Sequence, residues 1–432
     1  MEKYHEYKDS GIEWLGEIPE HWEIKRIKDV IKVSQGLQIS RSERFHKPRE
    51  NTVQYNTIPS IQGKIEEYIY KPSKNVLCTK EEMLVVRTGS GVGKILTNIE
   101  GAFHNNFFKA KNNKTIASKF CYFLLISYNT QFLMRSYAGL TAIPDLNHSD
   151  FYSIFFTLPK SKEQTQIANY LDIKTTTIDK KITLLEQKIK HYKAYRKTLI
   201  NKIVTKGLDK TAKLKDSGVD WIGDIPEHWE IRRYKSFGKT IKGKNMETSD
   251  VEFENSLPLL SLEYLRNDSV QHPTFCYSND KSLKSTDDDL IIVWDGAAVG
   301  EIIKSKIGYV SSTIAKLDIN NKKFNTKYFY HLRGAIDYKL KQIPTGMGIP
   351  HLNPTLFKNF KCPAPPIKEQ QQIANYLDTK TTTIDKIVNN IEAQITMLKE
   401  LRKTLINEVV TGKVKVTSTS LSHQKASNQP IV

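Results

Sequence analysis

One stretch of this sequence has the composition of a phosphate-binding loop. Gly89–Lys94 reads GSGVGK, which supplies glycines and a lysine of the kind that a P-loop uses to hold phosphate. The P-loop pattern also requires a glycine at Thr88 and a hydroxyl side chain at Ile95, and both are missing. The matching stretch in the second half of the chain, Asp295–Glu301, has no lysine. A tight turn between two strands, with glycine supplying backbone freedom, is therefore the preferred interpretation.

A second set of residues has the types that some nucleases use. Asp145, Asp172 and Lys174 could supply an acidic pair and a lysine, but His351 stands at the place of Asp145 in the second half, and Asp172 lies where a helix begins. No glycine-rich loop of the methyltransferase type follows a strand, and no nucleophile elbow or paired set of metal ligands is present. The sequence therefore predicts no catalytic residues, no metal site and no cofactor.

Basic and amide side chains in predicted loops are the candidates for contact with nucleic acid. Arg can read guanine and Asn can read adenine through paired hydrogen bonds, whereas Lys mostly contacts phosphate. The alternative is that each is an ordinary solvated surface group. The candidates are Arg41, Arg44, Lys47, Arg49, Arg87, Lys94, His104 and Asn105 in the first half, and Lys242, Lys244, Asn245 and Ser311 in the second.

The charge of the chain favours a polyanionic partner. Its net charge is +18, and residues 160–215 alone carry +10. A basic protein without a nucleic-acid partner is the alternative. No apolar run approaches the roughly 20 residues that span a bilayer, and the charged N-terminus lacks the apolar core of a secretory signal. The 4 cysteines form no CxxC pair, so we expect a cytoplasmic protein without a disulfide framework or structural zinc.

The elements that must position these residues occur twice. Lys162–Ile182 matches Lys368–Val388 at 17 of 21 positions, and Asp9–Lys28 matches Asp216–Lys235 at 14 of 20. Each half of the chain therefore consists of a tryptophan motif, a variable head and a long helix. The tryptophan motif is rich in Gly and Pro, so we expect a shaped loop that leads into a strand. A second interpretation is that the motif docks on the helices or on a partner subunit. Its tryptophans are expected to be packing anchors, with base stacking as the alternative; they are Trp14, Trp22, Trp221 and Trp229.

The two heads, residues 23–159 and 230–365, differ strongly in sequence. Short runs rich in Val, Ile, Phe and Tyr, broken by Gly, Asn and Pro, predict strands and turns. One or two helices are predicted in each head, at Ile116–Tyr137 and at Thr326–Lys341. Each head is therefore expected to be an α+β domain. A shared core with divergent surface loops is expected where two domains have the same function but act on different targets.

Both long helices carry apolar residues every seven positions, which is typical of a coiled coil. The heptad residues are Leu171, Ile178, Leu185 and Leu199 in the first helix and Leu377, Ile384, Ile391, Leu398 and Leu405 in the second. Since each head precedes its own helix, paired helices must run antiparallel with a head at each end. From Ile178 to Ile203 the helix would span about 38 Å at roughly 1.5 Å per residue, close to the roughly 34–36 Å of one turn of B-DNA.

Two features of the helices need a special explanation. Arg196 and Arg402 occupy the same heptad position, where an unpaired arginine is costly to bury. They are expected either to set the register of the pair or to extend their charges to its rim. Thr175–Thr177 is a poor helix interior, so we expect the helix to bend or to start afresh there.

The duplicated motifs resemble a known family. DSGxxWxGxIPxHWxIxR, KEQxQIAxYLD followed by KTTTID, and the order head–helix–head–helix closely resemble the specificity subunit of type I restriction–modification enzymes, over about residues 1–412. The resemblance implies two target-recognition domains, each reading one half of a bipartite site in double-stranded DNA, with the helices as a ruler between them. It also implies that two methyltransferase (modification) subunits bind the repeated regions and that restriction/translocase subunits join the complex.

The same resemblance assigns S-adenosylmethionine, ATP and magnesium to the partners, so this chain is expected to bind no cofactor. It supplies no catalytic residues, and base-contacting residues differ among the members. An enzyme and a coiled-coil scaffold stay open as alternatives: the first would cleave or methylate DNA alone and lose this with Asp145→Ala, and the second would show no salt-dependent DNA binding.

The expected fold is α+β, with two mixed α/β target-recognition domains joined by two long antiparallel coiled-coil helices in a pseudo-two-fold internal repeat. The expected parts are residues 1–159 (tryptophan motif and first recognition domain), 160–207 (first spacer helix), 208–365 (linker, tryptophan motif and second recognition domain), 366–412 (second spacer helix) and 413–432 (disordered tail).

Overall fold

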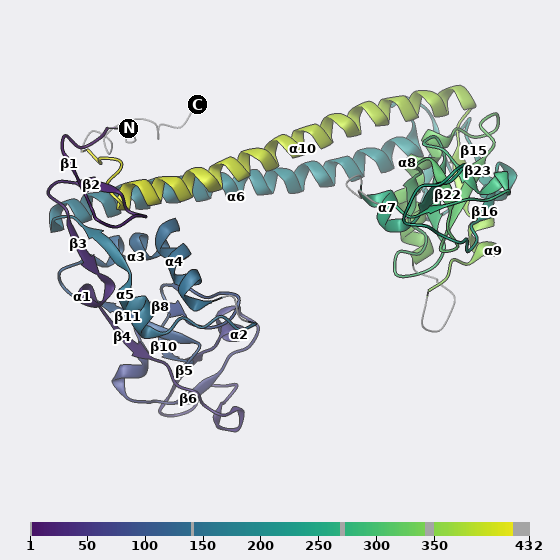
Figure 1. Cartoon of the computed structure of the whole chain (residues 1–432). Helices are drawn as coiled ribbons and strands as arrows, with labels where there is room; N and C mark the ends of the chain where they lie inside the picture. The colour runs from purple at the N-terminus through teal and green to yellow at the C-terminus, as the bar shows by residue number, and fades with distance from the viewer. Residues whose placement is uncertain (1, 140–141, 268–272, 342–349, 418–432) are drawn as a thin grey trace. The chain divides into compact units, whose positions relative to one another are not determined.

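The computed structural model of the chain describes residues 2–139, 142–267, 273–341 and 350–417. The chain divides into two compact units. The first contains the residues up to Glu186 and those from Glu392 onward, and the second contains Gln187–Ile391. Each unit therefore holds one head, the first part of the long helix that follows this head, and the last part of the other long helix (Figure 1).

The first head is built on two sheets whose strands come from separated parts of the sequence. The strands of the larger sheet are β4 (Ile31–Gln35), β8 (Met83–Val86), β9 (Ile95–Leu96) and β11 (Phe107–Asn112), and those of the smaller are β5 (Thr52–Asn56), β6 (Tyr68–Tyr70), β7 (Leu77–Cys78) and β10 (Gly101–Phe103). The larger sheet has the order β4-β11-β8-β9 and is antiparallel throughout. The smaller has the order β6-β5-β10-β7, in which β5 and β10 are parallel.

Short strand pairs and helices complete the first unit. The pairs are β1 (Tyr7–Asp9) with β2 (Glu17–Pro19) and β3 (Glu23–Arg26) with β12 (Phe155–Leu158). The helices are α1 (Ile27–Val30), α2 (Ile58–Ile61), α3 (Ser118–Ile126), α4 (Tyr128–Ala138) and α5 (His148–Ser153), with 3-10 turns η1 (Arg41–Glu43) and η2 (Lys74–Val76).

The second unit repeats this plan. Its larger sheet contains β16 (Gly238–Lys242), β20 (Leu290–Val293), β21 (Ile302–Lys304) and β23 (Ile314–Ile319), and its smaller sheet contains β17 (Leu257–Leu260), β18 (Phe275–Cys276), β19 (Lys284–Ser285) and β22 (Gly308–Val310). The strand pairs are β13 (Leu214–Asp216) with β14 (Asp224–Pro226) and β15 (Glu230–Arg233) with β24 (Lys361–Ala364). The helices are α7 (Leu262–Arg266), α8 (Thr326–Lys341) and α9 (Pro354–Lys358), with 3-10 turns η3 (Tyr234–Ser236) and η4 (Lys281–Leu283).

The two heads share one topology despite their different sequences. The order β16-β23-β20-β21 corresponds to β4-β11-β8-β9, and the parallel pair β17–β22 corresponds to β5–β10. The predicted α+β class is confirmed. The helical range predicted over Ile116–Tyr137 contains two helices, α3 and α4, which are separated at Ser127. The Ser127 hydroxyl donates a hydrogen bond to the Leu124 carbonyl at 2.8 Å, a local bond that competes with continuation of the helix.

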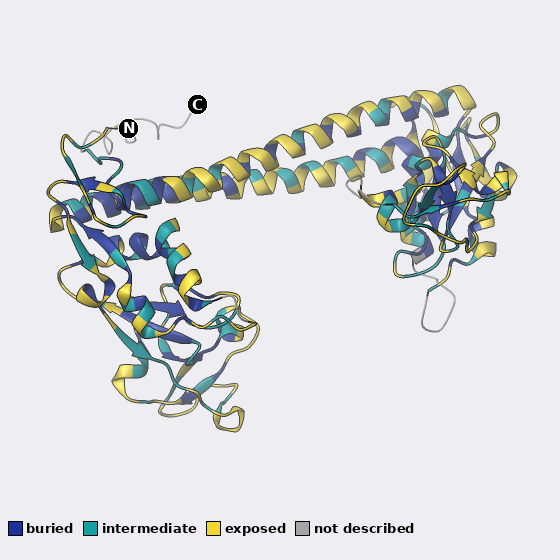
Figure 2. Cartoon of the chain, viewed as in Figure 1, coloured by how far each residue is buried: buried dark blue, intermediate teal, exposed yellow. Residues whose placement is uncertain are grey.

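The central strand β8 is apolar on both faces because each face is covered. Met83 and Val85 belong to the core shared with α3, whereas Leu84 and Val86 belong to a second cluster with residues of β10 and β11. Successive residues of a strand point to opposite faces, so a strand covered on both sides is a continuous apolar run. Figure 2 shows the buried strands inside each head and the exposed loops at their ends.

The long helices α6 (Ser161–Lys206) and α10 (Ile367–Val410) run antiparallel in the first unit. Strand β12 leads into α6, and its Thr157 hydroxyl donates a hydrogen bond to the carbonyl of Val410, the last residue of α10, at 2.6 Å. Further along α6, Asp179 forms an ion pair with Arg402 at 3.0 Å. Residue numbers therefore rise along α6 as they fall along α10.

The same pairing occurs in the second unit with the roles of the helices exchanged. The Tyr328 hydroxyl donates to the carbonyls of Val204, near the end of α6, and Pro363, shortly before α10, at 3.0 and 3.2 Å. Arg196 of α6 forms an ion pair with Asp385 of α10 at 3.0 Å. The predicted antiparallel direction is therefore found in each unit.

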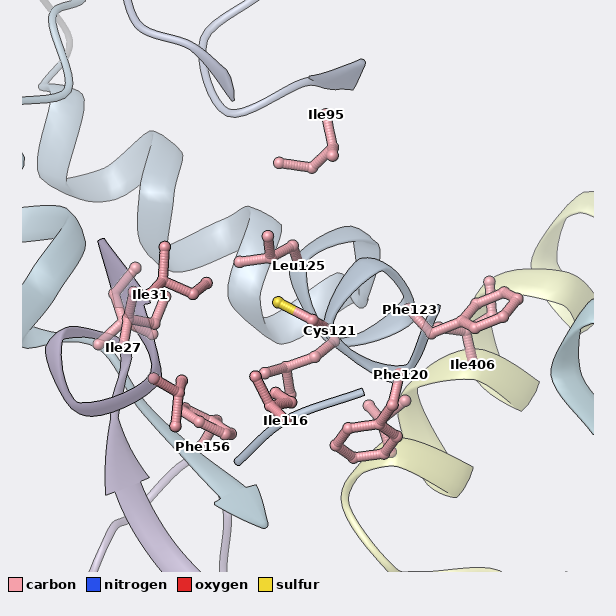
Figure 3. Close-up of a cluster of buried hydrophobic side chains, with 14 of the residues drawn as sticks. Ile27, Ile31, Ile95, Ile116, Phe120, Cys121, Phe123, Leu125, Phe156 and Ile406 are labelled. Carbon is pink, nitrogen blue, oxygen red and sulfur yellow. The ribbon is translucent and has the colours of Figure 1, made fainter. Parts of the chain in front are cut away.

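The heptad residues face the interior of their units. Leu171, Leu199, Leu377, Ile384, Ile391 and Leu405 are buried, and Ile178, Leu185 and Leu398 are half-buried. The helix pair also packs on the heads, since Phe123 of α3 lies beside Ile406 of α10 in the core of the first unit (Figure 3). Head and helices therefore form one core in each unit.

The repeated arginines are both paired and at the rim. The side chains of Arg196 and Arg402 are 28% and 29% exposed, and each contacts an aspartate of the opposite helix. The fresh start expected as one alternative at Thr175–Thr177 is wrong, because α6 continues through it. The hydroxyls of Thr175 and Thr177 donate to carbonyls four residues earlier, at 2.7 and 2.8 Å, which keeps them within the geometry of the helix.

Each tryptophan motif packs on the end of the other repeat's helix. Trp22 is fully buried beside Gly412, which ends the turn after α10 with φ +77°. A Cβ on Gly412 would lie 2.4 Å from Pro19 and 3.1 Å from Trp22, so a side chain is excluded there. Trp229 is equally buried, and a Cβ on Gly207, which has φ +72°, would lie 3.1 Å from it. Trp22 and Trp229 are therefore packing anchors, as predicted.

The residues after α10 are ordered further than expected. Val414 is buried in the core of the first unit, and the Lys415 N–H donates to the Glu2 carbonyl at 2.9 Å. The prediction that disorder begins at residue 413 is therefore wrong, because an apolar side chain and a backbone hydrogen bond hold this segment. The rest of the expected tail, residues 418–432, lies outside the described residues.

A double-mutant cycle on Arg402 and Asp179 tests what the interhelical ion pair contributes to stability. Because the two side chains are 29% and 52% exposed, we expect a coupling free energy of only about 0.2–1 kcal/mol. Urea unfolding of Arg402→Leu, Asp179→Ala and the double variant measures it. A coupling of several kcal/mol would instead show that the pair behaves as a buried one.

Candidate nucleic-acid interface

Three loops of the first head meet at one end of its larger sheet. Strand β11 begins where β4 and β8 end, since Phe108 pairs with Gln35 and Phe107 pairs with Val86. The loops that leave β4 and β8 and the loop that enters β11 therefore lie together. Backbone hydrogen bonds join them: the Arg87 N–H donates to the Asn106 carbonyl at 2.7 Å, and the Asn105 N–H donates to the Leu37 carbonyl at 2.9 Å. We call these the sheet-end loops of the first head: residues 36–40, 87–94 and 104–106.

The second head gathers its candidates in the same way. Lys242 ends β16 and pairs with Ala315, and Val293 ends β20 and pairs with Ile314 at the start of β23. A backbone bridge joins Lys244 to Ser311, at the same place where Leu37 and His104 are bridged in the first head. Its sheet-end loops, residues 243–249, 294–300 and 311–313, thus bring together candidates that lie far apart in the sequence.

Arg87 is the most highly organised candidate of the first head. Its Nε and Nη2 donate to the two carboxylate oxygens of Asp145, both at 2.8 Å. The backbone holds the two residues side by side, because Thr88 and Asp145 form a β-bridge and the Leu146 N–H donates to the Arg87 carbonyl at 3.0 Å. Both side chains keep access to solvent, at 29% and 43% exposed.

The glycine-rich stretch after Arg87 is the tight turn between β8 and β9 that the sequence favoured. The Val86 N–H donates to the Lys94 carbonyl and the Gly93 N–H donates to the Val86 carbonyl, both at 2.9 Å. Gly89 and Gly93 have φ of +84° and +83°, a conformation that side chains rarely adopt. The turn leaves Lys94 exposed beside the sheet-end loops.

The corresponding place in the second head holds a different set of charges. Asp295 and His351 form the β-bridge there, and the His351 Nδ1 lies 2.6 Å from the carboxylate of Asp295. Lys242 donates to the same carboxylate at 3.2 Å and lies 5.6 Å from the centre of the Trp294 ring. Trp294 therefore stands where the first head has Arg87, one residue after the central strand. The sequence identified His351 only as the counterpart of Asp145, and its place beside Asp295 follows from the fold.

Arg44 lines a cavity of about 490 Å³ but is held by structural contacts. It pairs with Glu67 at 3.0 Å, with the two side chains only 14% and 6% exposed, and donates twice to the Ile39 carbonyl. Glu67 also accepts a hydrogen bond from the Thr57 hydroxyl at 2.8 Å. Arg41 lines the same cavity and is exposed. Of the two arginines, Arg41 is therefore the better placed for an external partner.

Burial sets the protonation of two histidines near these loops. Burial lowers the pKa of His104, and the charge of Arg44 lowers it further. Burial likewise lowers the pKa of His148, with Arg87 contributing in the same direction. Both imidazoles are therefore biased toward the neutral form near these arginines.

The remaining candidates are spread over the head surfaces. Lys47 and Arg49 are exposed near the edge of the smaller sheet, with Arg49 stacked at 4.0 Å from the centre of the Phe45 ring. The Asn105 amide donates to Gln38 at 3.0 Å, which makes Gln38 a neighbour that the sequence did not single out. In the second head Asn245 is exposed, Lys244 pairs with Asp280 at 3.0 Å, and the Ser311 hydroxyl donates to the Leu260 carbonyl at 2.8 Å.

The described part of the chain has neither a helix that could span a membrane nor a cluster of metal-binding side chains. Within residues 2–139, 142–267, 273–341 and 350–417, no helix is long and apolar enough to cross a membrane, and no group of at least 3 His, Cys, Asp or Glu side chains is arranged to hold a metal ion.

Comparison with protein families matches the chain twice to one model. The model for the type I restriction modification DNA specificity domain covers residues 19–191 and 226–397. The chain belongs to the type I restriction–modification DNA specificity family. Each match contains one complete head with its sheet-end loops and part of the helix that follows.

Relatives within this family are similar over part or nearly all of the chain. The type I restriction enzyme MjaVIII specificity subunit of Methanocaldococcus jannaschii is 35% identical over 191 residues, which is 44% of either chain. The putative type I restriction enzyme MjaX specificity subunit of the same organism is 23% identical and covers 93% of this chain and 96% of its own.

Solved structures support the fold of a specificity-family chain. A chain from a study of complex assembly and conformational transition in the type I R-M system aligns over 92% of this chain and 99% of its own, with a TM-score of 0.71 and 18% identity. The HsdS subunit from Thermoanaerobacter tengcongensis aligns over 92% of this chain and 98% of its own, with a TM-score of 0.54 and 19% identity.

Replacing Arg44 tests whether the main role of this side chain is to stabilise the fold. Arg44→Met leaves the buried Glu67 carboxylate without its cation, so we expect a loss of about 3–5 kcal/mol in unfolding free energy. Arg41→Met, on the exposed side of the same cavity, is the matched control and should change stability by less than about 0.5 kcal/mol. Chemical denaturation measures both, and equal losses would contradict the structural role of Arg44.

Proposed function

We propose that this chain is the non-catalytic DNA sequence-specificity subunit of a type I restriction–modification complex. Each target-recognition domain binds one half of a bipartite site in double-stranded DNA. The paired helices set the spacer between the half-sites and dock two methyltransferase subunits, through which restriction subunits join. We place this complex in the cytoplasm, where its DNA target lies.

The observation that carries the proposal is the contrast between the two heads. Both have the strand order of one DNA-specificity domain, and both collect basic and amide side chains at the same end of the larger sheet. At this end the chemistry differs, with Arg87 and Asp145 in one head and Lys242, Asp295 and His351 in the other. One scaffold with two sets of reading groups is what recognition of two unlike half-sites requires.

The repeated frame supports the proposed spacer and docking roles. The residues that build the helix pair recur at an offset of 206, so that Asp179–Arg402 and Asp385–Arg196 are equivalent contacts. Equivalent surfaces suit two identical partners, which is the basis for proposing two methyltransferase subunits. Family membership supports the absence of catalysis, since the chemistry would belong to those partners.

Methylation mapping with the cognate methyltransferase tests the proposal. Cells that express both chains should carry methylation at one bipartite motif, and replacing residues 30–158 with the matching head of another family member should change one half of it. The head replacement keeps the helices, so the spacer length should stay the same. Changes in both halves, or in neither, would contradict the assignment of one half-site to each head.

Changing the length of both helices tests the ruler. Seven residues add about 10.5 Å of helix, or about 3 base pairs of duplex, so inserting one heptad in each helix should lengthen the spacer and leave both half-sites unchanged. The motif is again read from methylation sequencing. An unchanged spacer would contradict the ruler, and insertion of the same heptads in the variant with the replaced head provides a control in a second sequence context.

A further inference from the structure

The Arg87–Asp145 pair has a geometry suited to reading one base. A guanidinium carries its N–H donors in a fixed planar fork, and a carboxylate can occupy one edge of that fork. Here Asp145 occupies the edge formed by Nε and Nη2, with both hydrogen bonds at 2.8 Å. The outer edge, formed by Nη1 and the second hydrogen of Nη2, donates to no acceptor among the described residues.

We propose that Arg87, positioned by Asp145, reads a guanine in the half-site of the first head. This inference rests on the proposed function and names the base that one residue recognises. The outer edge of the fork presents two parallel N–H donors, and guanine presents two neighbouring acceptors, O6 and N7, in the major groove. No other base offers two acceptors there, so the fit is specific.

The surroundings of the pair favour a base over a phosphate. A guanidinium that is free to rotate can follow a phosphate, but Arg87 is fixed by two bonds from its side chain and by two hydrogen bonds of its backbone, to Asn106 and from Leu146. Asp145 also brings a negative charge that is unfavourable next to a phosphate. A fixed fork with a carboxylate behind it loses little conformational freedom on binding, which makes it better suited to a flat base edge.

The neighbouring side chains complete a reading surface. His104, Asn105 and Asn106 lie on the loop that Arg87 contacts, and the Asn105 amide is already oriented by Gln38. Lys94 is exposed on the turn that follows Arg87 and is placed to contact the backbone phosphates. The sheet-end loops thus contain a fixed central guanidinium with amides and an exposed cation around it.

The second head has no arginine at the corresponding position, which limits the inference to the first. Trp294 stands in the place of Arg87, and the cation of the site is Lys242, whose ammonium donates to Asp295 at 3.2 Å. A lysine presents a point charge without a planar pair of donors. Arg87 is therefore expected to specify a base that has no equivalent contact in the other half-site.

The test compares variants of the full chain in complex with its methyltransferase. Arg87→Gln removes the charge and the fork, Arg87→Lys keeps the charge and removes the fork, and Asp145→Asn weakens the positioning of the fork. Lys111→Gln is the matched control, since it removes one exposed cation from the opposite end of the same sheet. Methylation sequencing gives the motif, binding to duplexes with single base changes gives the affinity, and thermal unfolding shows that each variant is folded.

We expect the wild-type motif to contain a guanine in the half read by the first head. Arg87→Gln and Arg87→Lys should relax the requirement at this one position and lower affinity for the original site by about 10- to 100-fold, with the other half unchanged. Asp145→Asn should relax the same position to a smaller extent, which a purely structural role would not do. Lys111→Gln should keep the motif.

Several results would overturn the inference. These are a first half-site without guanine on either strand, folded Arg87 variants that keep every base preference, or a loss of affinity that is equal for all sequences, which would indicate a phosphate contact. If Arg87→Gln does not fold, the base preferences of the Arg87→Lys variant decide whether the inference holds. Failure of the proposed function has a different signature: the wild-type complex then modifies no bipartite motif at all, whereas failure of the inference leaves that motif intact and insensitive to Arg87.

Discussion

The junction between a buried tryptophan and a helix-ending glycine is the contact on which the rest of the structure depends. Trp22 packs beside Gly412 and Trp229 packs beside Gly207, so the motif that opens each half closes on the helix that ends the other half. A side chain at Gly412 would meet Pro19 at 2.4 Å, which makes the contact intolerant of substitution. The junction fixes where each helix ends beside the head of the other half, and hence where the heptads and the Asp–Arg pairs must meet.

Glutamates at the helix starts strengthen this junction. Glu369 accepts a hydrogen bond from the Trp229 indole at 3.1 Å and lies 2.9 Å from the ring nitrogen of His228. Glu163 accepts a hydrogen bond from the Tyr4 hydroxyl at 2.6 Å and lies 3.0 Å from His21. A carboxylate in the first turn of a helix is also favoured by the helix dipole. The best preserved parts of the repeat are thus those that join head to helix, which explains why they recur while the heads diverge.

The sequence was sufficient to predict the repeat, the fold class and the direction of the helices, because these depend on periodic apolar residues and on connectivity. It failed where a single hydrogen bond decides the outcome. Ser127 separates two helices at a position that the sequence did not specify. The hydroxyls of Thr175 and Thr177 keep a helix continuous where β-branching predicts a bend or a fresh start. The order at Val414 was missed because two alternating valines, Val414 and Val416, are too short a pattern to predict an ordered segment in a polar tail.

In the candidate interface, too, the sequence predicts some features and only the folded structure determines the others. Arg41, Arg87 and Lys242 could be chosen by side-chain type, but only the strand order reveals which loops share one end of a sheet. Side-chain type also could not distinguish Arg44, held by a buried carboxylate, from Arg41, which is exposed in the same cavity. Asp145 was considered as a catalytic acid, and its place beside Arg87 gives it a different use, as the group that orients a cation.

The equivalence of the two interhelical contacts has a consequence for how such a protein can be assembled. Residues 1–207 contain Trp22 and Gly207, and also Asp179 and Arg196, which are the two sides of each repeated contact. Two copies of this half would therefore offer each other the tryptophan–glycine contact and the Asp–Arg pair that recur in both units. A homodimer built in this way would carry the same head twice, and its target would be a palindrome. Duplication into one chain releases the two heads from this symmetry, so that each can change its preferred bases independently.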